Sequence, residues 1–225
     1  MLEAMNLLII PGSTRRASFN RQLARAAARL AAAAGLEPTV LELSVFDVPL
    51  YDADLEANGT PTDVLTLKAL FAAAPGWLVV SPEYNGSYPP LLKNVFDWVS
   101  SPVRGHPVWA DGTRATRGKV VGVLSASPGA VGGLRAHTPL LHLLWTLGCW
   151  VSPAAWAVGR AHEAFDAHGQ LREPDATAVR RVIESVAHAM WGLGSSQAVP
   201  GSSTAPGGSS EPTGGSATGA ASSAP

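Results

Sequence analysis

Short apolar runs alternate with helix-forming stretches along most of this chain, and this alternation restricts the possible folds more than any other feature. We expect strands at residues 6–10, 39–43, 77–81, 119–126 and 150–158. We expect helices at residues 19–34, 61–74, 90–100, 134–147 and 175–192. Strands that are apolar throughout are typical of parallel sheets buried on both faces. The sequence therefore predicts five βα units in a doubly wound α/β fold, with helices on both faces of a five-stranded parallel sheet.

The composition changes abruptly after this pattern ends. Residues 195–225 consist almost entirely of Ser, Gly, Ala, Pro and Thr, with Glu211 as the one charged residue. Such a segment has too little apolar side chain to offset the entropy lost on ordering it. We therefore expect one domain at residues 1–194, followed by a disordered tail at residues 195–225. A single domain agrees with the length of 225 residues.

Charge and hydrophobicity exclude several classes of partner. The net charge of −1 gives no general attraction to nucleic acids, and no apolar run approaches the roughly 18–20 residues of a membrane span. The start of the chain does not resemble a signal peptide. The single cysteine, Cys149, cannot form an internal disulfide, and its apolar neighbours place it in the core. We expect a cytoplasmic protein that binds neither nucleic acid nor membrane.

The loop after the first strand combines the features of a phosphate site. In doubly wound folds ligands bind at the carboxyl ends of the strands. Here Gly12 permits a tight turn, an arginine supplies positive charge, and the next helix points its free N–H groups into the loop. The side chains that can donate hydrogen bonds are Ser13, Thr14, Ser18 and Asn20. The motifs of nucleotide triphosphatases and dinucleotide-binding folds are absent, which favours a monophosphate. The alternative is that Ser18 only caps the helix and that Arg15 and Arg16 are solvated.

Two further loops follow the third and fourth strands. Residues 81–90 contain three prolines, a glycine and two tyrosines, and could present backbone N–H groups and a flat apolar edge to an aromatic heterocycle. Within the helix that follows, Phe96 and Trp98 are expected to belong to the core. Residues 125–135 contain three glycines that permit close approach of the backbone to a ligand, although glycines in such turns equally serve packing.

Three motifs stand in order along the chain: Gly12-Ser13-Thr14-Arg15-x-x-Ser18-x-Asn20, Pro82-Glu83-Tyr84-Asn85-x-Ser87-x-Pro89-x-x-Leu92-Lys93-Asn94-x-x-Asp97-Trp98, and Ser125-x-Ser127-x-Gly129-x-x-Gly132-Gly133. With these motifs, and with the segment at residues 48–52, the sequence from residue 6 to about residue 135 resembles the NADPH-dependent FMN reductase family. Members of that family have a flavodoxin-like fold, bind FMN without a covalent bond, and use NAD(P)H as co-substrate. They include quinone, chromate and azo-dye reductases, so the resemblance does not select the acceptor.

The resemblance also implies a role for each residue of the motifs. The FMN phosphate would be held by Ser13, Arg15, Ser18 and Asn20, with Gly12 in the turn. The isoalloxazine ring would be lined by Pro82, Glu83, Tyr84 and Asn85, and its other edge closed by Ser125, Ser127 and Gly129. Members are usually dimers or tetramers, which implies a homodimer or homotetramer here. Two features depart from the family pattern: Thr14 replaces a common aliphatic residue, and residues 102–118 form a longer stretch than usual.

The expected activity is transfer of a hydride from the nicotinamide to the flavin and then reduction of a small acceptor. Because the cofactor carries this chemistry, we expect no catalytic side chain. Two alternatives keep the fold: a flavodoxin-like electron carrier or sensor without turnover of its own, and a protein that binds another phosphate ligand and no flavin. Absorbance and NAD(P)H oxidation by the purified protein would separate them.

A metal site and a cysteine nucleophile are both disfavoured by the sequence. His137 and His142 are five residues apart and so lie on different faces of a helix, where they cannot bind one ion. The acidic residues from Asp52 to Glu56 resemble a calcium loop, but Ala57 stands where that loop needs glycine. Cys149 has no base nearby in the sequence.

Overall fold

The computed structural model describes residues 5–196. The expected tail at residues 195–225 lies outside this part of the chain, apart from residues 195 and 196, which continue the last helix. The last helix thus runs two residues beyond the predicted domain end at residue 194, and the domain boundaries stay a prediction.

The central sheet has the predicted parallel, five-stranded arrangement. Its strands are β1 (Asn6–Pro11), β2 (Glu37–Val40), β3 (Gly76–Val80), β4 (Val120–Ala126) and β5 (Trp150–Val158). They lie in the order β2-β1-β3-β4-β5, and every neighbouring pair is parallel. This is the strand order of flavodoxin-like folds, in which the order reverses at β1 and β3. Ligands in such sheets bind outside the carboxyl ends of the strands, next to this point of reversal.

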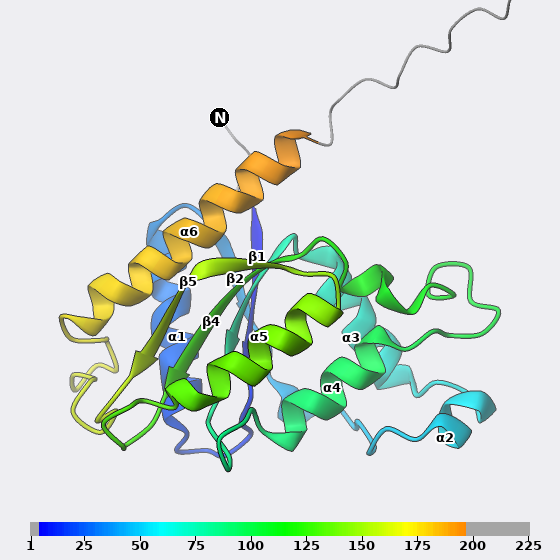
Figure 1. Ribbon diagram of the computed structural model, residues 1–225, viewed down its shortest axis with the longest axis horizontal. Coiled ribbons are helices and arrows are strands. Elements are labelled where there is room, and N and C mark those ends of the chain that lie inside the picture. The colour runs from blue at the N-terminus through cyan, green and yellow to red at the C-terminus, as the bar shows by residue number, and fades with distance from the viewer. Residues whose placement is uncertain (1–4, 197–225) are drawn as a thin grey trace, which may run out of the picture.

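Helices cover both faces of the sheet, as Figure 1 shows. The longer helices are α1 (Phe19–Ala33), α3 (Thr62–Ala73), α4 (Pro90–Ser100), α5 (His137–Thr146) and α6 (Asp175–Ser196). One apolar cluster joins α1 and α6 to one face of the sheet, and a second joins α3, α4 and α5 to the other. Alternate residues of β1 enter the two clusters: Leu7 and Ile9 face the first, and Leu8 and Ile10 face the second. Two-sided burial explains why these strands are apolar throughout.

The second strand begins and ends earlier than predicted. We expected residues 39–43, whereas β2 pairs residues 37–40 with β1, and Leu43 begins a short 3₁₀ helix, η1 (Leu43–Val45). β2 is an edge strand whose residues are exposed or half-buried, so its start lacks an apolar signal. Leu41 and Leu43 are buried, but in the turn that leaves the strand. The predicted helix at residues 134–147 likewise begins as a 3₁₀ turn, η3 (Leu134–Ala136), before α5.

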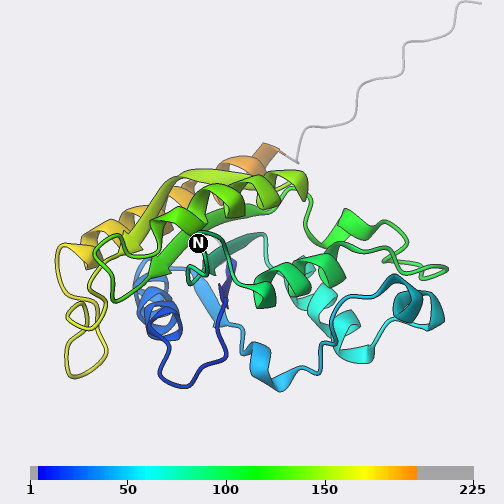
Figure 2. The same ribbon diagram turned by 60° about the horizontal axis from the view of Figure 1, so that its bottom comes forward.

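The long stretch at residues 102–118 lies beside a short helix that the sequence did not predict. This helix, α2 (Ala53–Asn58), begins at Asp52, whose carboxylate accepts from the N–H groups of Asp54 and Leu55. The stretch contains the 3₁₀ helix η2 (Gly112–Ala115) and lies with α2 at one end of the molecule (Figure 2). Residues of both segments line a cavity of about 450 Å³. The acidic residues that resemble a calcium loop therefore serve as the helix cap, Asp52, and as part of α2, Asp54 and Glu56.

Two expectations from the composition can be compared with the structure. Cys149 is buried in the core as predicted, and burial raises the pKa of its thiol to about 12. Within residues 5–196, no helix has the length and apolar character needed to cross a membrane.

Candidate functional site

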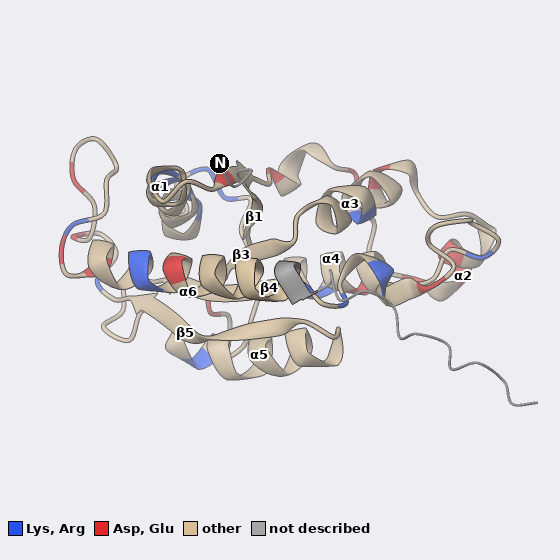
Figure 3. Cartoon of the chain, turned by 90° about the horizontal axis from the view of Figure 1, so that it is seen from above, with Lys and Arg blue, Asp and Glu red and all other residues tan. Residues whose placement is uncertain are grey.

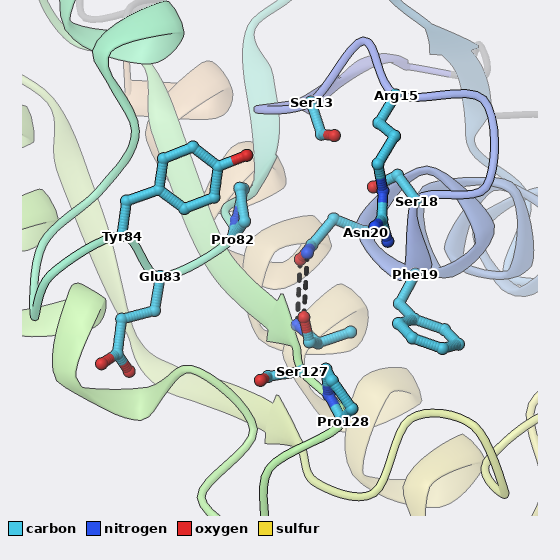
Figure 4. A pocket seen from close by; sticks show the side chains of 11 residues that line it. Ser13, Arg15, Ser18, Phe19, Asn20, Pro82, Glu83, Tyr84, Ser127 and Pro128 are labelled. Atoms are coloured by element: carbon cyan, nitrogen blue, oxygen red, sulfur yellow. Dashed lines mark hydrogen bonds between the residues drawn. The ribbon is translucent and has the colours of Figure 1, made fainter.

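Two adjoining cavities lie at the carboxyl ends of β1, β3 and β4. The first, of about 220 Å³, is lined by Ser13, Arg15, Ser18, Phe19, Asn20, Pro82, Glu83, Tyr84, Ala126, Ser127 and Pro128 (Figure 4). The second, of about 460 Å³, is lined by Glu83, Asn85, Gly86, Ser127, Gly129, Val131, Gly133 and Arg135. Because Glu83 and Ser127 line both, the two cavities form one site. Its combined size suits a small-molecule ligand, for which pockets of roughly 300–1,000 Å³ are usual. The structure thus brings together three loops that are far apart in the sequence.

The loop after β1 presents a run of free backbone donors. No residue in the described part of the chain accepts a hydrogen bond from the backbone N–H groups of residues 13–17. The chain approaches β3 closely here, because the N–H of Gly12 donates to the Val80 carbonyl at 2.9 Å. A Cβ atom on Gly12 would lie 2.7 Å from a methyl carbon of Leu92, so a larger residue here would displace the Leu92 side chain. Successive N–H groups before a helix N-terminus form a typical anion-binding loop.

Arg15 adds a positive charge to this loop. Its guanidinium donates to the Ala17 carbonyl at 3.1 Å, and no carboxylate in residues 5–196 forms an ion pair with it. Figure 4 shows its side chain directed toward Ser18 and Asn20. Ser18 is buried, and its hydroxyl oxygen accepts from the N–H of Arg21, so it caps α1 as the alternative interpretation held. The cap uses the oxygen as acceptor and leaves its O–H available to donate.

Asn20 has a structural partner that the sequence did not predict. Its amide Nδ2 donates to the Ala126 carbonyl at 2.9 Å, and its Oδ1 accepts from the Ala126 N–H at 2.9 Å. Asn20 lines the first cavity, but these two bonds tie the first turn of α1 to the end of β4. Its assignment to the phosphate stays a prediction.

The loop after β3 is a tight turn. Tyr84 and Ser87 exchange backbone hydrogen bonds of 2.8 and 3.0 Å. The two residues between them, Asn85 and Gly86, both have positive φ, 52° and 80°. Asn-Gly is the preferred pair for a turn with this geometry. The turn leaves Tyr84 exposed, and Figure 4 shows its ring at the side of the first cavity near Pro82.

Glu83 connects this loop to the loop after β4. Its Oε1 accepts from Arg135 Nε at 2.6 Å, and the Glu83 side chain is 9% exposed. In Figure 4 its carboxylate points away from Arg15. Arg135 was not among the predicted site residues, although it lies in the loop at residues 125–135 that the sequence singled out. The negative charge of Glu83 is thus compensated locally and does not face the phosphate loop.

The end of β4, where this loop begins, is bonded to the start of α5. Ser125 is fully buried, and its hydroxyl lies 2.8 Å from Nε2 of His137 at the start of α5. Burial lowers the pKa of His137, which favours the neutral imidazole. Ser125 therefore faces the interior and is not among the residues that line either cavity, whereas Ser127 and Gly129 are. A ligand role for Ser125 stays a prediction.

Residues in the second half of the motif at residues 82–98 hold the segment after β2 in place. The Asn94 amide donates to the Pro49 carbonyl at 2.9 Å and accepts from the Tyr51 N–H at 2.7 Å. The indole N–H of Trp98 also donates to the Pro49 carbonyl, at 2.8 Å. Trp98 and Phe96 are fully buried, which confirms that both belong to the core. These residues position the segment after β2 and do not line the site.

The residues of the first cavity fit the phosphate end of FMN. Residues 13–17, of which Ser13 and Arg15 line the cavity, have five backbone N–H groups without an acceptor in residues 5–196. With the Arg15 guanidinium, which forms no ion pair in that range, and the Ser13 side chain, they form a donor set for a dianion at a helix N-terminus. Pro82 and Tyr84 supply apolar surface beside it for a ring system. Phe19 and Pro128 also line this cavity and were not predicted. A bulky residue next to Ser18 or Ser127 does not by itself indicate a binding site in the sequence.

A metal centre has no support in the described part of the chain. No group of three or more His, Cys, Asp or Glu side chains in residues 5–196 is placed to hold an ion.

Comparisons with known proteins place this chain in a family. The family model for NADPH-dependent FMN reductases matches residues 5–163. A quinone reductase of Pseudomonas putida is 32% identical over 192 residues, which cover 83% of this chain and 95% of that protein. An NAD(P)H-dependent FMN reductase of Pseudomonas aeruginosa is 31% identical over 84% of this chain and 95% of that protein.

A solved structure agrees with these relatives. FerB of Paracoccus denitrificans, described as a flavoenzyme NAD(P)H:(acceptor) oxidoreductase, superposes with a TM-score of 0.70 at 28% identity. The alignment covers 84% of this chain and 98% of that one. The fold, the anion-binding loop and the extent of these matches lead to one conclusion: the chain belongs to the NADPH-dependent FMN reductase family.

Proposed function

We propose that this protein is an NAD(P)H-dependent FMN oxidoreductase that passes electrons to a quinone-type or other small acceptor. The observation that carries the proposal is the first cavity, where free backbone N–H groups and Arg15 lie next to Pro82 and Tyr84 in a member of this family. When bound, FMN accepts a hydride from a nicotinamide and gives electrons to an acceptor. The protein supplies binding, orientation and electrostatics.

Each loop has a part in this proposal. Ser13, Arg15 and Ser18 hold the phosphate, with Asn20 fixing the floor of the cavity through Ala126. The turn from Pro82 to Asn85 lines the ring, and Ser127 and Gly129 border its other edge. The backbone N–H groups of Asn85 and Gly86 have no acceptor within the described residues and can stabilise negative charge on a reduced ring. We assign no catalytic acid or base.

The relatives support a quinone-type acceptor. Proteins named quinone reductase from Pseudomonas putida and Escherichia coli are 32% and 35% identical to this chain. Their names describe turnover and therefore favour an enzyme over an electron carrier or sensor. The purified protein should show the absorbance of bound FMN and should oxidise NAD(P)H when a quinone is added. A preparation that is colourless after addition of FMN and removal of the unbound cofactor would refute the proposal.

The surface of α5 and β5 supports a homo-oligomer, a dimer or a tetramer. Trp145 on α5 and Trp150 on β5 are 60% and 61% exposed. Helix α5 carries no Lys, Arg, Asp or Glu, and in Figure 3 it is tan, with a blue segment only where the chain enters it. Exposed aromatic residues on an uncharged surface are typical of subunit contacts. Sedimentation velocity should give at least twice the monomer mass, and Trp145→Lys should reduce it.

The buried thiol of Cys149 supports work in a reducing compartment, which we take to be the cytoplasm. A fractionation experiment with the native protein tests this assignment directly.

A further inference from the structure

The second cavity has one feature that binding of FMN does not require. Three of its eight lining residues are glycines, Gly86, Gly129 and Gly133, which leave backbone exposed in the wall. Val131 adds an apolar side chain that is 57% exposed. At its edge lies the positively charged Arg135, whose side chain is 74% exposed. The cavity therefore offers exposed backbone and one apolar side chain, with a cation at one side.

The pairing of Arg135 leaves its most effective donors free. Only Nε is bonded, to Oε1 of Glu83, and neither Nη group has an acceptor within residues 5–196. The Glu83 side chain is 9% exposed, so the carboxylate is covered while the guanidinium stays accessible. The two Nη groups of an arginine form a planar fork that matches the oxygens of carboxylates, phosphates and similar anions.

Other arginines of this chain show what a purely structural pair looks like. Arg21 is 18% exposed, and both of its Nη groups are bonded, one to Glu42 and one to the Thr14 carbonyl. Arg117 bonds Asp111 through both of its Nη groups. In both arginines the two Nη groups are bonded within the protein. At Arg135 the Glu83 carboxylate accepts from Nε and thereby orients the two Nη groups, which have no acceptor within residues 5–196.

We propose that Arg135 is a specificity-determining residue that recognises a negatively charged oxygen substituent on a flat aromatic acceptor, with Glu83 as its positioning residue. The inference rests on the proposed function, because it assigns the edge of the second cavity, at Arg135, to the acceptor. Ser127 and Gly129 would border the ring of FMN, so the acceptor takes the part of the cavity beside Arg135, where its anionic group meets the Nη fork. A neutral quinone of the same size lacks this contact.

The test compares charged and neutral ligands in the FMN-loaded protein. Calorimetric titration with naphthalene-2-sulfonate and with neutral 2-naphthamide gives a ratio of dissociation constants that depends on neither colour nor turnover. A charged hydrogen bond changes a dissociation constant by about ten- to a hundredfold. Arg135→Gln should therefore reduce the preference for the sulfonate at least about tenfold, and Arg135→Lys, which keeps the charge and loses the fork, should reduce it less.

Arg160→Gln is the matched control, because Arg160 is 73% exposed and does not line the cavity. It should leave the ratio unchanged. In steady-state assays, Arg135→Gln should lower kcat/KM for anthraquinone-2-sulfonate relative to menadione, through KM. Thermal unfolding checks that both Arg135 variants are folded.

Three results would overturn the inference: an unchanged ratio in both Arg135 variants, an equal change in Arg160→Gln, or a selective rise in KM for NADPH over NADH. The last result would assign the fork to the nucleotide phosphate. A wild-type protein that holds no FMN would instead refute the proposed function, so the two failures are distinguishable.

Discussion

The side-chain amide of Asn20 pairs with both backbone groups of Ala126, through two hydrogen bonds of 2.9 Å. Asn20 lies in the first turn of α1, and Ala126 is the last residue of β4. The loop that precedes α1 and the loop that follows β4 both line the first cavity. One buried pair therefore fixes the relative position of two walls of the site.

Asn20→Ala should destabilise the protein even without FMN. The substitution leaves a buried N–H and a buried carbonyl of Ala126 without partners, which costs about 1–3 kcal/mol for each group. Urea unfolding of the apoprotein measures the loss. Gln22→Ala on the same helix is the control, since its side chain has no hydrogen bond within the described residues. If Asn20→Ala kept the stability of the apoprotein and lost only FMN affinity, Asn20 would act as a phosphate ligand and not as a structural link between α1 and β4.

Arg15→Ala should weaken FMN binding by about ten- to a hundredfold, because it removes a charge-assisted hydrogen bond to the phosphate. The side chain forms no ion pair within residues 5–196, so the unfolding free energy of the apoprotein should change little. Titration of apoprotein with FMN gives the dissociation constant. Arg16→Ala removes an equally exposed charge that does not line the cavity, and it should have a much smaller effect. Equal effects of the two substitutions would argue against a specific role for Arg15.

Gly132→Ala should destabilise the protein more than Gly118→Ala. Both glycines have positive φ, 64° and 77°, so both substitutions incur the same backbone strain. Only at Gly132 would the new Cβ lie 2.7 Å from the backbone of Ala157 and Val158, whereas Gly118 has open space. Forced overpacking costs about 1–3 kcal/mol. Chemical unfolding of both variants isolates this contribution, and equal losses would show that the loop can move away from β5.

Lys68 should make the stability depend on pH in the alkaline range. Its side chain is fully buried, its Nζ donates to the carbonyls of Val99 and Ser101, and burial lowers its pKa from 10.5 to about 8. Between these values the unfolded chain binds a proton that the folded chain has released. The unfolding free energy should therefore rise with pH, by at most about 1.4 kcal/mol per unit.

Lys68→Met removes this titration. Urea unfolding of both proteins from pH 7.5 to pH 10 gives the difference between them at each pH. The wild type should gain stability relative to the variant as the pH increases. A difference that stays constant would mean that Lys68 keeps its proton in the folded state across this range.

Most of the fold could be predicted because its strands are buried on both faces. β1, β3 and β4 are almost entirely buried, so each appears in the sequence as an apolar run. β2 could be located only approximately, because an edge strand that begins with Glu37 and Pro38 has no such run. Helix α2 was missed because it is short and contains no buried residue. In the sequence its cap, Asp52, stands out only as part of a possible calcium loop.

The loops of the site could be predicted, but the partners of their side chains could not. The carboxyl ends of the strands and the residue types indicated which loops would meet. The bonds from Asn20 to Ala126 and from Glu83 to Arg135 join residues that are 106 and 52 positions apart. Such pairs follow from the crossover connections and the register of the sheet, which a single sequence does not specify side chain by side chain. Ser125 illustrates the same limit, since its partner is a buried histidine in the next helix.

The most direct test of the proposed oxidoreductase is its steady-state kinetics with FMN bound. If the loops after β3 and β4 cover one face of the flavin, the nicotinamide and the quinone must use the same open face in turn. Initial rates measured against NADPH at several fixed concentrations of quinone should then give parallel double-reciprocal lines, with quinone competing against NADPH at high concentration. Intersecting lines would contradict a shared face, and the absence of turnover with both NADH and NADPH would contradict the proposed activity itself.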